Sequence, residues 1–166
     1  IVDSLLRETR KLTYIKRKIY ILYNKNLAVV KNFDHQYLQI LFSNVIREDL
    51  NFERIIFQRQ SDRSMIIILH CSYINNLPEI NIDNIIKSLI SIFANYKIFL
   101  DLFVDARLID EMEWRASQPL DNLLPKELQW SSSSKIGFCG DWFDLNSCGG
   151  VETAMNSSIR LVKLLK

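Results

Sequence analysis

The residue types with the clearest chemical meaning lie together near the C-terminal end of the chain. All four glycines fall between positions 137 and 150, within the segment Lys135-Ile-Gly-Phe-Cys-Gly-Asp-Trp-Phe-Asp-Leu-Asn-Ser-Cys-Gly-Gly-Val-Glu-Thr-Ala154. Glycine is kept where the backbone needs a positive φ angle or where another group must come close. This segment is therefore where the sequence predicts a ligand.

The same segment predicts a short strand over 136–139, a turn, and a helix from about Gly150 to Leu165. A helix N-terminus entered through glycines presents backbone N–H groups and a partial positive charge of about half a unit. That end suits a phosphate or a developing anion, and the pair 149–150 allows a close approach. Asp141 adds a carboxylate that can accept hydrogen bonds from sugar or ribityl hydroxyls. Such an arrangement can bind a nucleotide-like cofactor. The spacing is equally compatible with the alternative that Gly-Asp and Gly-Gly only form turns.

Other chemistries find less support in the residues. The spacing matches neither Gly-x-Gly-x-x-Gly nor the Walker loop, and the two histidines form no triad with a nucleophile and an acid. His70-Cys71 could be a redox or metal pair, but only His35 and Cys139 or Cys148 remain as further ligands. Core packing is the preferred interpretation, and no metal site is expected. A disulfide across the turn from 139 to 148 is geometrically allowed, although a reducing compartment argues against it.

Composition limits the classes of protein to consider. With 166 residues and 48% hydrophobic content the chain can bury a core of one domain or slightly more. A net charge of +2 gives no general attraction to nucleic acid or an anionic membrane. The most apolar stretch, 65–69, is far shorter than the roughly 18 to 20 residues of a membrane span. With three cysteines in no Cys-x-x-Cys spacing and no leader pattern, we expect a cytoplasmic protein.

The first half of the chain predicts strands and one helix. Residues 17–23 and 27–30 are rich in β-branched and aromatic residues and predict a hairpin. The 3.6-residue period then predicts a helix over about 35–47, with Asp34 as its N-cap. Residues 53–59 and 65–71 predict two strands joined by the turn 61–64. The second of these strands is apolar on both faces, so we expect it at the centre of its sheet.

The second half predicts fewer regular elements before the glycine segment. A helix with Asn81 or Asp83 as its cap is expected from 82 onward. A strand with Leu108, Met112 and Trp114 on one side is expected to reach Arg115. Prolines and a serine run predict a surface crossing without regular structure over most of 117–134. The apolar face of the last helix consists of Val151, Ala154, Met155, Ile159, Val162 and Leu165.

Two further groups of residues are expected to be structural. A basic run precedes and enters the first strand, and we expect it to be a solvated face on an edge strand, where lysines block aggregation. Trp114 and Trp130 are expected to be packing anchors. The basic run consists of Arg7, Arg10, Lys11, Lys16, Arg17 and Lys18.

Two motifs carry a family resemblance. Gly137-Phe-Cys-Gly-Asp-Trp-Phe143, followed by Gly150-Val-Glu-Thr-Ala-Met155, resembles the C-terminal flavin-binding signature of FAD-dependent amine-oxidase-type oxidoreductases, in particular their renalase-like branch. Upstream, Glu113-Trp-Arg-Ala-Ser-Gln-Pro119 is similar to the stretch that precedes this signature in the family. The resemblance is clearest over 107–166, and it extends more weakly over 53–72 as strands of a substrate domain.

The resemblance implies an α/β (α+β-like) fold. A mixed or antiparallel substrate-domain sheet with covering helices would occupy 1–116, and a crossing loop would occupy 117–135. Residues 136–166 would form the C-terminal strand–helix segment of an FAD-binding Rossmann-type domain. The implied activity is two-electron oxidation of a small reduced substrate, an amine or a reduced nicotinamide dinucleotide, by FAD.

The resemblance also assigns residues to the cofactor. Gly140 and Asp141 would contact the ribityl-phosphate part of FAD, and Trp142 would line the substrate face of the ring. The last helix would begin at the N1/C2 carbonyl edge, where its dipole stabilises the negative charge of reduced flavin. The residues that place it there are Gly150, Val151 and Glu152. The resemblance names no catalytic residue.

Two departures from the family pattern shape the prediction. Thr153 and Ser158 stand where many relatives have glycine, and no Gly-x-Gly-x-x-Gly precedes position 137. We therefore expect the C-terminal part of such an enzyme, inactive alone, with the missing N-terminal FAD-binding half as a partner and no nucleic-acid or membrane partner. One alternative is a non-catalytic remnant or interaction domain that does not bind FAD. The other is a nucleotide-binding module without redox activity.

Overall fold

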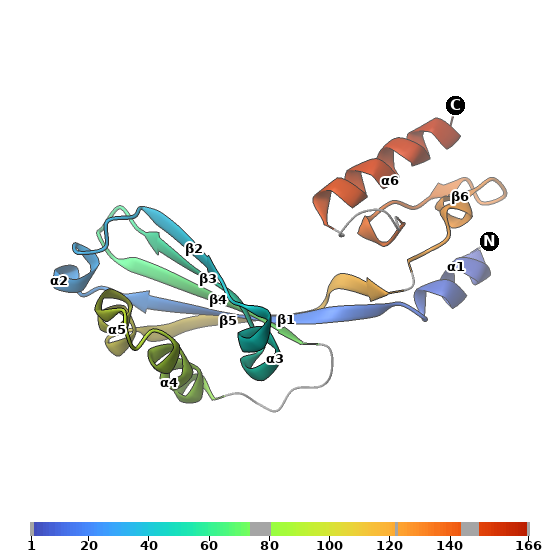
Figure 1. The fold of residues 1–166 in the computed structure, drawn as a ribbon. Helices are drawn as coiled ribbons and strands as arrows, with labels where there is room; N and C mark the ends of the chain where they lie inside the picture. The colour runs from blue at the N-terminus through green and yellow to red at the C-terminus, as the bar shows by residue number, and fades with distance from the viewer. Residues whose placement is uncertain (1, 74–80, 122, 144–149, 166) are drawn as a thin grey trace. The chain divides into compact units, whose positions relative to one another are not determined.

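The computed structural model describes residues 2–73, 81–121, 123–143 and 150–165 (Figure 1). The chain divides into two compact units. We call Arg17–Trp114 the sheet unit, and Ile1–Lys16 with Arg115–Lys166 the terminal unit. The elements in chain order are α1 Val2–Thr9, β1 Thr13–Asn24, α2 Leu27–Val30, β2 Tyr37–Leu41, α3 Asn44–Leu50, β3 Phe52–Arg59, β4 Met65–Tyr73, α4 Ile82–Ile92, α5 Lys97–Val104, β5 Arg107–Asp121, η1 Lys126–Gln129, β6 Trp130–Ser131, β7 Ile136–Gly137, η2 Asp141–Phe143 and α6 Val151–Leu164.

The chain is a mixed α/β protein with a five-stranded antiparallel sheet in the order β2-β3-β4-β1-β5. The predicted pair of strands over 53–59 and 65–71 is confirmed as β3 and β4, which pair with Ile56 opposite Ile68. In the turn between them, the Asp62 carboxylate accepts hydrogen bonds from the Ser64 backbone N–H at 3.0 Å and from its hydroxyl at 2.6 Å. As predicted, β4 lies at the centre of the sheet.

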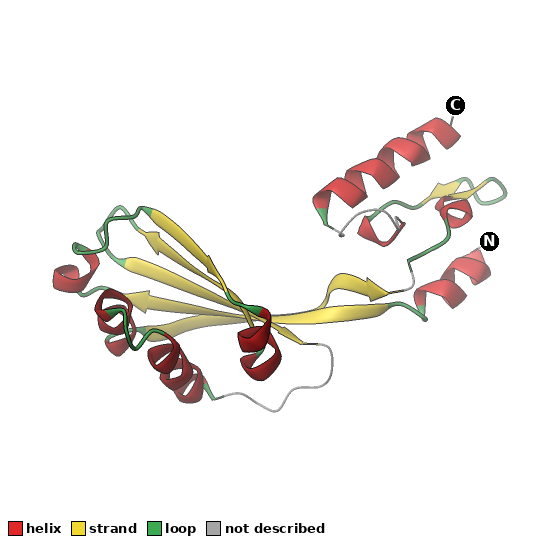
Figure 2. Ribbon diagram, in the orientation of Figure 1, coloured by secondary structure: helices red, strands yellow, loops and turns green. Residues whose placement is uncertain are grey.

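The core lies on one face of this sheet, because every second side chain of β4 is buried and those between are partly exposed. Helices α4 and α5 lie along that face (Figure 2). Four phenylalanine rings join strand to helices: Phe57 to Phe99 at 5.1 Å, Phe93 to Phe99 at 4.8 Å, and Phe57 to Phe103 at 6.0 Å between ring centroids. The predicted cap of α4 is confirmed, since the Asn81 side chain accepts a hydrogen bond from the Asp83 N–H at 2.8 Å.

The predicted hairpin over 17–30 is wrong in its second strand. Residues Leu27–Val30 form the helical turn α2, and the Asn26 side chain caps it by accepting a hydrogen bond from the Ala28 N–H at 3.1 Å. An asparagine that offers its side chain to the backbone two residues on favours a helix start over an extended chain. This local bond outweighs the β propensity of the two valines.

The predicted helix over about 35–47 is also wrong, and Asp34 caps no helix. The segment contains strand β2 and then helix α3, whose N-cap is Ser43. Within β2, Leu38 and Ile40 turn toward the core while the residues beside them are exposed. Apolar residues here fit both a period of 3.6 and a period of two, and pairing with β3 decides for the strand.

Strand β5 extends the predicted strand to Asp121, so the expected lack of regular structure over 117–134 is wrong for much of that segment. Pro119 lies within β5, which is tolerated because β5 is an edge strand of the sheet. Further on, η1 and β6 occupy Lys126–Gln129 and Trp130–Ser131. No helix in the described ranges is long and apolar enough to cross a membrane.

The basic run is a solvated face in part only. β1 is an interior strand rather than an edge. Arg17 forms a two-point ion pair with Glu53, at 2.7 Å and 3.1 Å, and Lys18 pairs with Glu111 at 3.2 Å. Desolvation raises the pKa of Glu53, but the bonds and charge of Arg17 outweigh it and lower that pKa overall. Trp114 is 49% exposed, so it is not the buried anchor that we expected.

The α4 contact with the sheet can be tested by truncating Leu89, which is completely buried. The substitution Leu89→Ala should lower the free energy of unfolding by about 2–5 kcal/mol, because it removes apolar contacts and leaves a cavity. Leu41→Ala is the matched control, since Leu41 is 68% exposed and should change stability by less than about 0.5 kcal/mol. Denaturant titrations followed by circular dichroism would measure both; equal losses would contradict the packing described.

Because of Cys71 on β4, the free energy of unfolding should depend on pH in the alkaline range. Burial raises the pKa of its thiol from 9.0 to about 12. Between these values the thiol ionises in the unfolded chain but not in the folded one, so its contribution to stability is full below pH 9.0 and declines toward about 12. Relative to Cys71→Ala, the natural chain should therefore lose up to about 1.4 kcal/mol per pH unit in that window. Parallel slopes for the two proteins would contradict a buried neutral thiol.

Candidate cofactor-binding site

Helix α6 begins where the sequence predicts, directly after Gly150. This residue is the N-cap, with φ 86° and ψ −155°, and no side chain caps the helix in the part of the chain that is described. A Cβ added at Gly150 would meet no atom of the described residues within 4 Å, and the positive φ favours glycine there. Val151 is 78% exposed and Glu152 is exposed as well. The side chains of the first two residues of α6 are therefore exposed.

The side of α6 that packs is not its apolar stripe. Its two fully buried residues are Thr153 and Ser157. The members of the predicted apolar face are instead between 52% and 78% exposed at Val151, Met155, Ile159 and Val162. Within the described part of the terminal unit, α6 thus has a buried hydroxyl side and an uncovered apolar stripe.

The segment before α6 is held against Ser157. The Gly140 N–H donates to the Ser157 hydroxyl at 2.8 Å, and the Gln129 amide donates to the Ser157 carbonyl at 3.0 Å. The Phe138 N–H donates in turn to the Gln129 carbonyl at 2.8 Å. The predicted strand over 136–139 is shorter than expected: β7 covers Ile136–Gly137 and pairs antiparallel with β6. Ser157 thus connects helix, strand and loop in the terminal unit.

Gly137 and Gly140 are both glycines for a packing reason. A Cβ at Gly137 would lie 2.8 Å from the Leu161 side chain of α6. A Cβ at Gly140 would lie 2.6 Å from the indole nitrogen of Trp142. The Trp142 ring therefore packs over the Gly140 backbone. The backbone carbonyl of Trp142 accepts a hydrogen bond from the Leu124 N–H at 2.7 Å. The close approach expected at Gly140 is made by Trp142 itself.

Asp141 begins the short helix η2, which packs on α6. Its side chain is half-buried and lies close to Tyr14 on β1. Burial raises the pKa of the Tyr14 phenol, and the negative charge of Asp141 raises it further. Tyr14 packs on the small apolar cluster of the terminal unit, which is formed by Leu5, Leu12, Leu124 and Phe143.

The predicted site residues fall into two groups along α6. Gly140, Asp141 and Trp142 lie beside Ser157, which is two helical turns, or about 10 Å, from Gly150. Val151 and Glu152 lie at the helix start. A ligand that contacted both groups would be an extended molecule, with one part at the open helix end and another at Asp141. Gly149 and Cys148, and with them the disulfide considered above, lie outside the described residues.

His70 and Cys71 do not act as a pair. Successive side chains of β4 point to opposite faces, so Cys71 enters the core while His70 lies beside Arg54, with 3.5 Å between Nδ1 and Nη2. Burial lowers the pKa of His70, and the Arg54 charge lowers it further. Within the described ranges no three His, Cys, Asp or Glu side chains gather into a cluster that could hold a metal ion.

Comparison with known proteins found no relative. No family model, no curated protein and no solved structure matches the chain. The support for a function comes from the geometry above together with the resemblance of the two motifs.

Sequence reasoning missed Ser157, although it holds the segment together. A signal was present: Thr153 and Ser157 are spaced by four residues, so they share one side of a helix whose other side is apolar. Two hydroxyl residues on one stripe of a helix offer hydrogen-bond partners to a neighbouring loop. The family resemblance, by contrast, marks Thr153 only as a departure from a glycine.

The role of Ser157 can be tested against its neighbour. Ser157→Ala removes the acceptor of the Gly140 N–H in a buried place and should cost the terminal unit about 1–3 kcal/mol. Ser158→Ala is the matched control, because its hydroxyl donates within α6 to the Ala154 carbonyl at 2.8 Å and holds no loop. Hydrogen exchange at the Gly140 amide should accelerate in the first variant and stay unchanged in the second. Equal exchange rates in both variants would refute the assigned contact.

Proposed function

We propose that the chain supplies the C-terminal part of the cofactor site of an FAD-dependent oxidoreductase, together with its substrate-domain sheet. The observation that carries this proposal is α6. Its start is entered through Gly150 into open space, and its apolar stripe is exposed along its length. One helix thus offers both an end that can bind an anion and an apolar surface on which a further sheet could pack.

In a Rossmann-type domain, helices lie with their apolar side on a parallel sheet, and the cofactor contacts helix N-termini. We infer that the exposed stripe of α6 packs on the sheet of the N-terminal FAD-binding half, which would be this chain's partner. Residues 136–166 would then be the strand–helix unit at the end of that domain. The two-residue β7 would gain its remaining neighbours from the same partner.

The described residues fit parts of an extended cofactor. The open N-terminus of α6 suits the carbonyl edge of a flavin, because the helix dipole stabilises negative charge there. Asp141 is half-buried, and its carboxylate suits a ribityl hydroxyl. The Gly140 N–H already donates to Ser157, so Gly140 would position Trp142 rather than bind the cofactor itself. Trp142, which is 36% exposed, would line the ring.

Bound FAD would supply two-electron oxidation of a small reduced substrate, with an amine or a reduced nicotinamide dinucleotide as the substrate class that the resemblance implies. This chain's own part would be to hold one end of the cofactor, to favour negative charge on it and to contribute the sheet of the substrate domain. This oxidation would require the FAD-binding half as well, so the isolated chain would be inactive.

The proposal predicts that Asp141→Ala weakens FAD binding by the purified chain. Loss of a hydrogen bond to a charged acceptor should cost about tenfold in affinity. Asp110→Ala is the matched control, since Asp110 is an exposed aspartate on β5 in the sheet unit. Titration of FAD, followed by the change in its fluorescence and by the flavin band at roughly 450 nm that stays with the protein after free FAD is removed, would measure both.

The outcomes of this titration distinguish the three functional hypotheses for the chain. Binding that Asp141→Ala weakens and Asp110→Ala leaves unchanged supports the flavin site. Binding that neither variant changes would refute the role of Asp141. A chain that retains no flavin once free FAD is removed, even when mixed with a separately expressed FAD-binding half, would favour the remnant or interaction domain. Binding of inorganic phosphate or adenosine phosphates without flavin would favour the nucleotide-binding module.

A further inference from the structure

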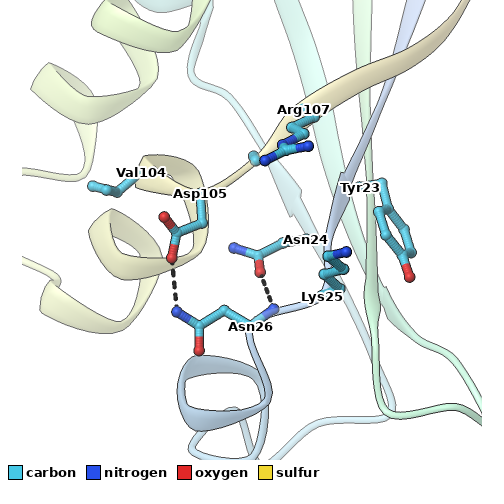
Figure 3. A pocket seen from close by; sticks show the side chains of 8 residues that line it. Tyr23, Asn24, Lys25, Asn26, Val104, Asp105 and Arg107 are labelled. Carbon is cyan, nitrogen blue, oxygen red and sulfur yellow. Dashed lines mark hydrogen bonds between the residues drawn. The ribbon is translucent and has the colours of Figure 1, made fainter.

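A second candidate site lies within the sheet unit, where β1 ends and β5 begins. The cavity there has a volume of about 640 Å³ and is shown in Figure 3. This size falls within the range of about 300–1,000 Å³ that is usual for small-molecule sites. Its lining residues are Tyr23, Asn24, Lys25, Asn26, Val104, Asp105, Ala106 and Arg107.

A chain of hydrogen bonds fixes the floor of this cavity. Asn24 is completely buried; its amide donates to the Leu102 carbonyl at 2.7 Å, and its side-chain oxygen accepts from the Asn26 N–H at 2.7 Å. The Asn26 amide donates in turn to an oxygen of Asp105 at 2.7 Å. Figure 3 shows the last two of these bonds. The end of β1 is therefore tied to the segment that leads into β5, and the site is formed before any ligand arrives.

The charges around the cavity favour a single negative charge. Lys25 and Arg107 are exposed at its edge, and neither forms an ion pair with a described residue. The Asp105 carboxylate offsets one of the two positive charges while it accepts the bond from Asn26. The lining thus keeps an excess of one positive charge. The planar guanidinium of Arg107 can donate two parallel hydrogen bonds, which match a carboxylate.

Tyr23 gives the cavity an apolar wall. It lines the cavity beside Lys25 and presents an aromatic ring (Figure 3). Aromatic side chains bind planar apolar groups through their faces and edges. A cavity lined by an aromatic ring, an ammonium group and a guanidinium group is suited to a ligand with one charged end and one flat apolar part.

We propose that this cavity binds a small aromatic carboxylate. Its carboxylate is held by Arg107 and Lys25, and its ring lies against Tyr23. The site belongs entirely to the sheet unit and does not depend on the flavin proposal, which concerns residues of the terminal unit.

Benzoate is the probe that tests this site, in a titration of the isotope-labelled chain followed by amide chemical shifts. Saturable shifts should appear at Lys25, Asn26 and the 105–107 segment. Arg107→Gln and Lys25→Gln should each weaken binding by about tenfold, because each removes a charge-assisted hydrogen bond. Lys31→Gln is the matched control, since Lys31 is an exposed cation that follows α2 and does not line the cavity.

Further variants and a second probe test which chemical class of ligand the cavity binds. Tyr23→Leu should weaken benzoate but not acetate, because only benzoate has a ring to place on the tyrosine. Arg107→Lys keeps the charge and the exposed position, so a weakening in this variant reports the loss of the two-point bond. Inorganic phosphate should shift these amides less than benzoate does at equal concentration.

The proposal is overturned by shifts that do not saturate, by shifts spread over basic residues elsewhere, or by an equal loss in Lys31→Gln. It is also overturned if the affinity for phosphate equals that for benzoate, since the site would then recognise only the negative charge of the ligand. Unchanged benzoate affinity in both Arg107 variants would exclude the assigned contact.

Discussion

The one-sided burial of the central sheet is the constraint on which the rest of the sheet unit depends. β4 places Ile67, Leu69 and Cys71 on the face that the helices cover, and each of them is completely buried. Helix α4 and helix α5 contribute Leu89 and Phe103 to the same layer. A slip of one residue in β4 would turn Ile67, Leu69 and Cys71 to the other face. The pairing register of the neighbouring strands is therefore fixed by the burial of this one strand.

The terminal unit depends on a different kind of interaction. Its apolar cluster is small, and Gly140 and Gln129 are held by hydrogen bonds that they donate to Ser157 of α6. Buried hydrogen bonds specify geometry strongly, because an unpaired partner is costly, but they remove little apolar surface from water. This is why α6 can be firmly placed on one side and still leave Val151, Met155 and Ile159 exposed on another.

Elements with a single strong pattern could be predicted from the sequence, and those with two compatible patterns could not. The pair β3 and β4 and the caps of α4 and α6 follow from turn residues, asparagine and glycine at fixed places. Residues 37–41 fit a helix or a strand until the pairing with β3 is known. The turn α2 depends on the Asn26 cap, which a scale of β propensity does not contain. Likewise, the bond from Gly140 to Ser157 joins two segments whose contact no local pattern predicts.

The glycine cluster shows how far such a pattern reaches toward function. Gly137 makes room for Leu161, and Gly140 makes room for Trp142, so two of its members are explained by the chain's own packing. Gly150 differs, because a Cβ there would meet no atom of the described residues and the backbone angle, φ 86°, favours glycine. Among the described residues of this segment, the start of α6 at Gly150 and the carboxylate of Asp141 are therefore the groups best placed to contact a ligand, because the space beside Gly137 and Gly140 is occupied by Leu161 and Trp142.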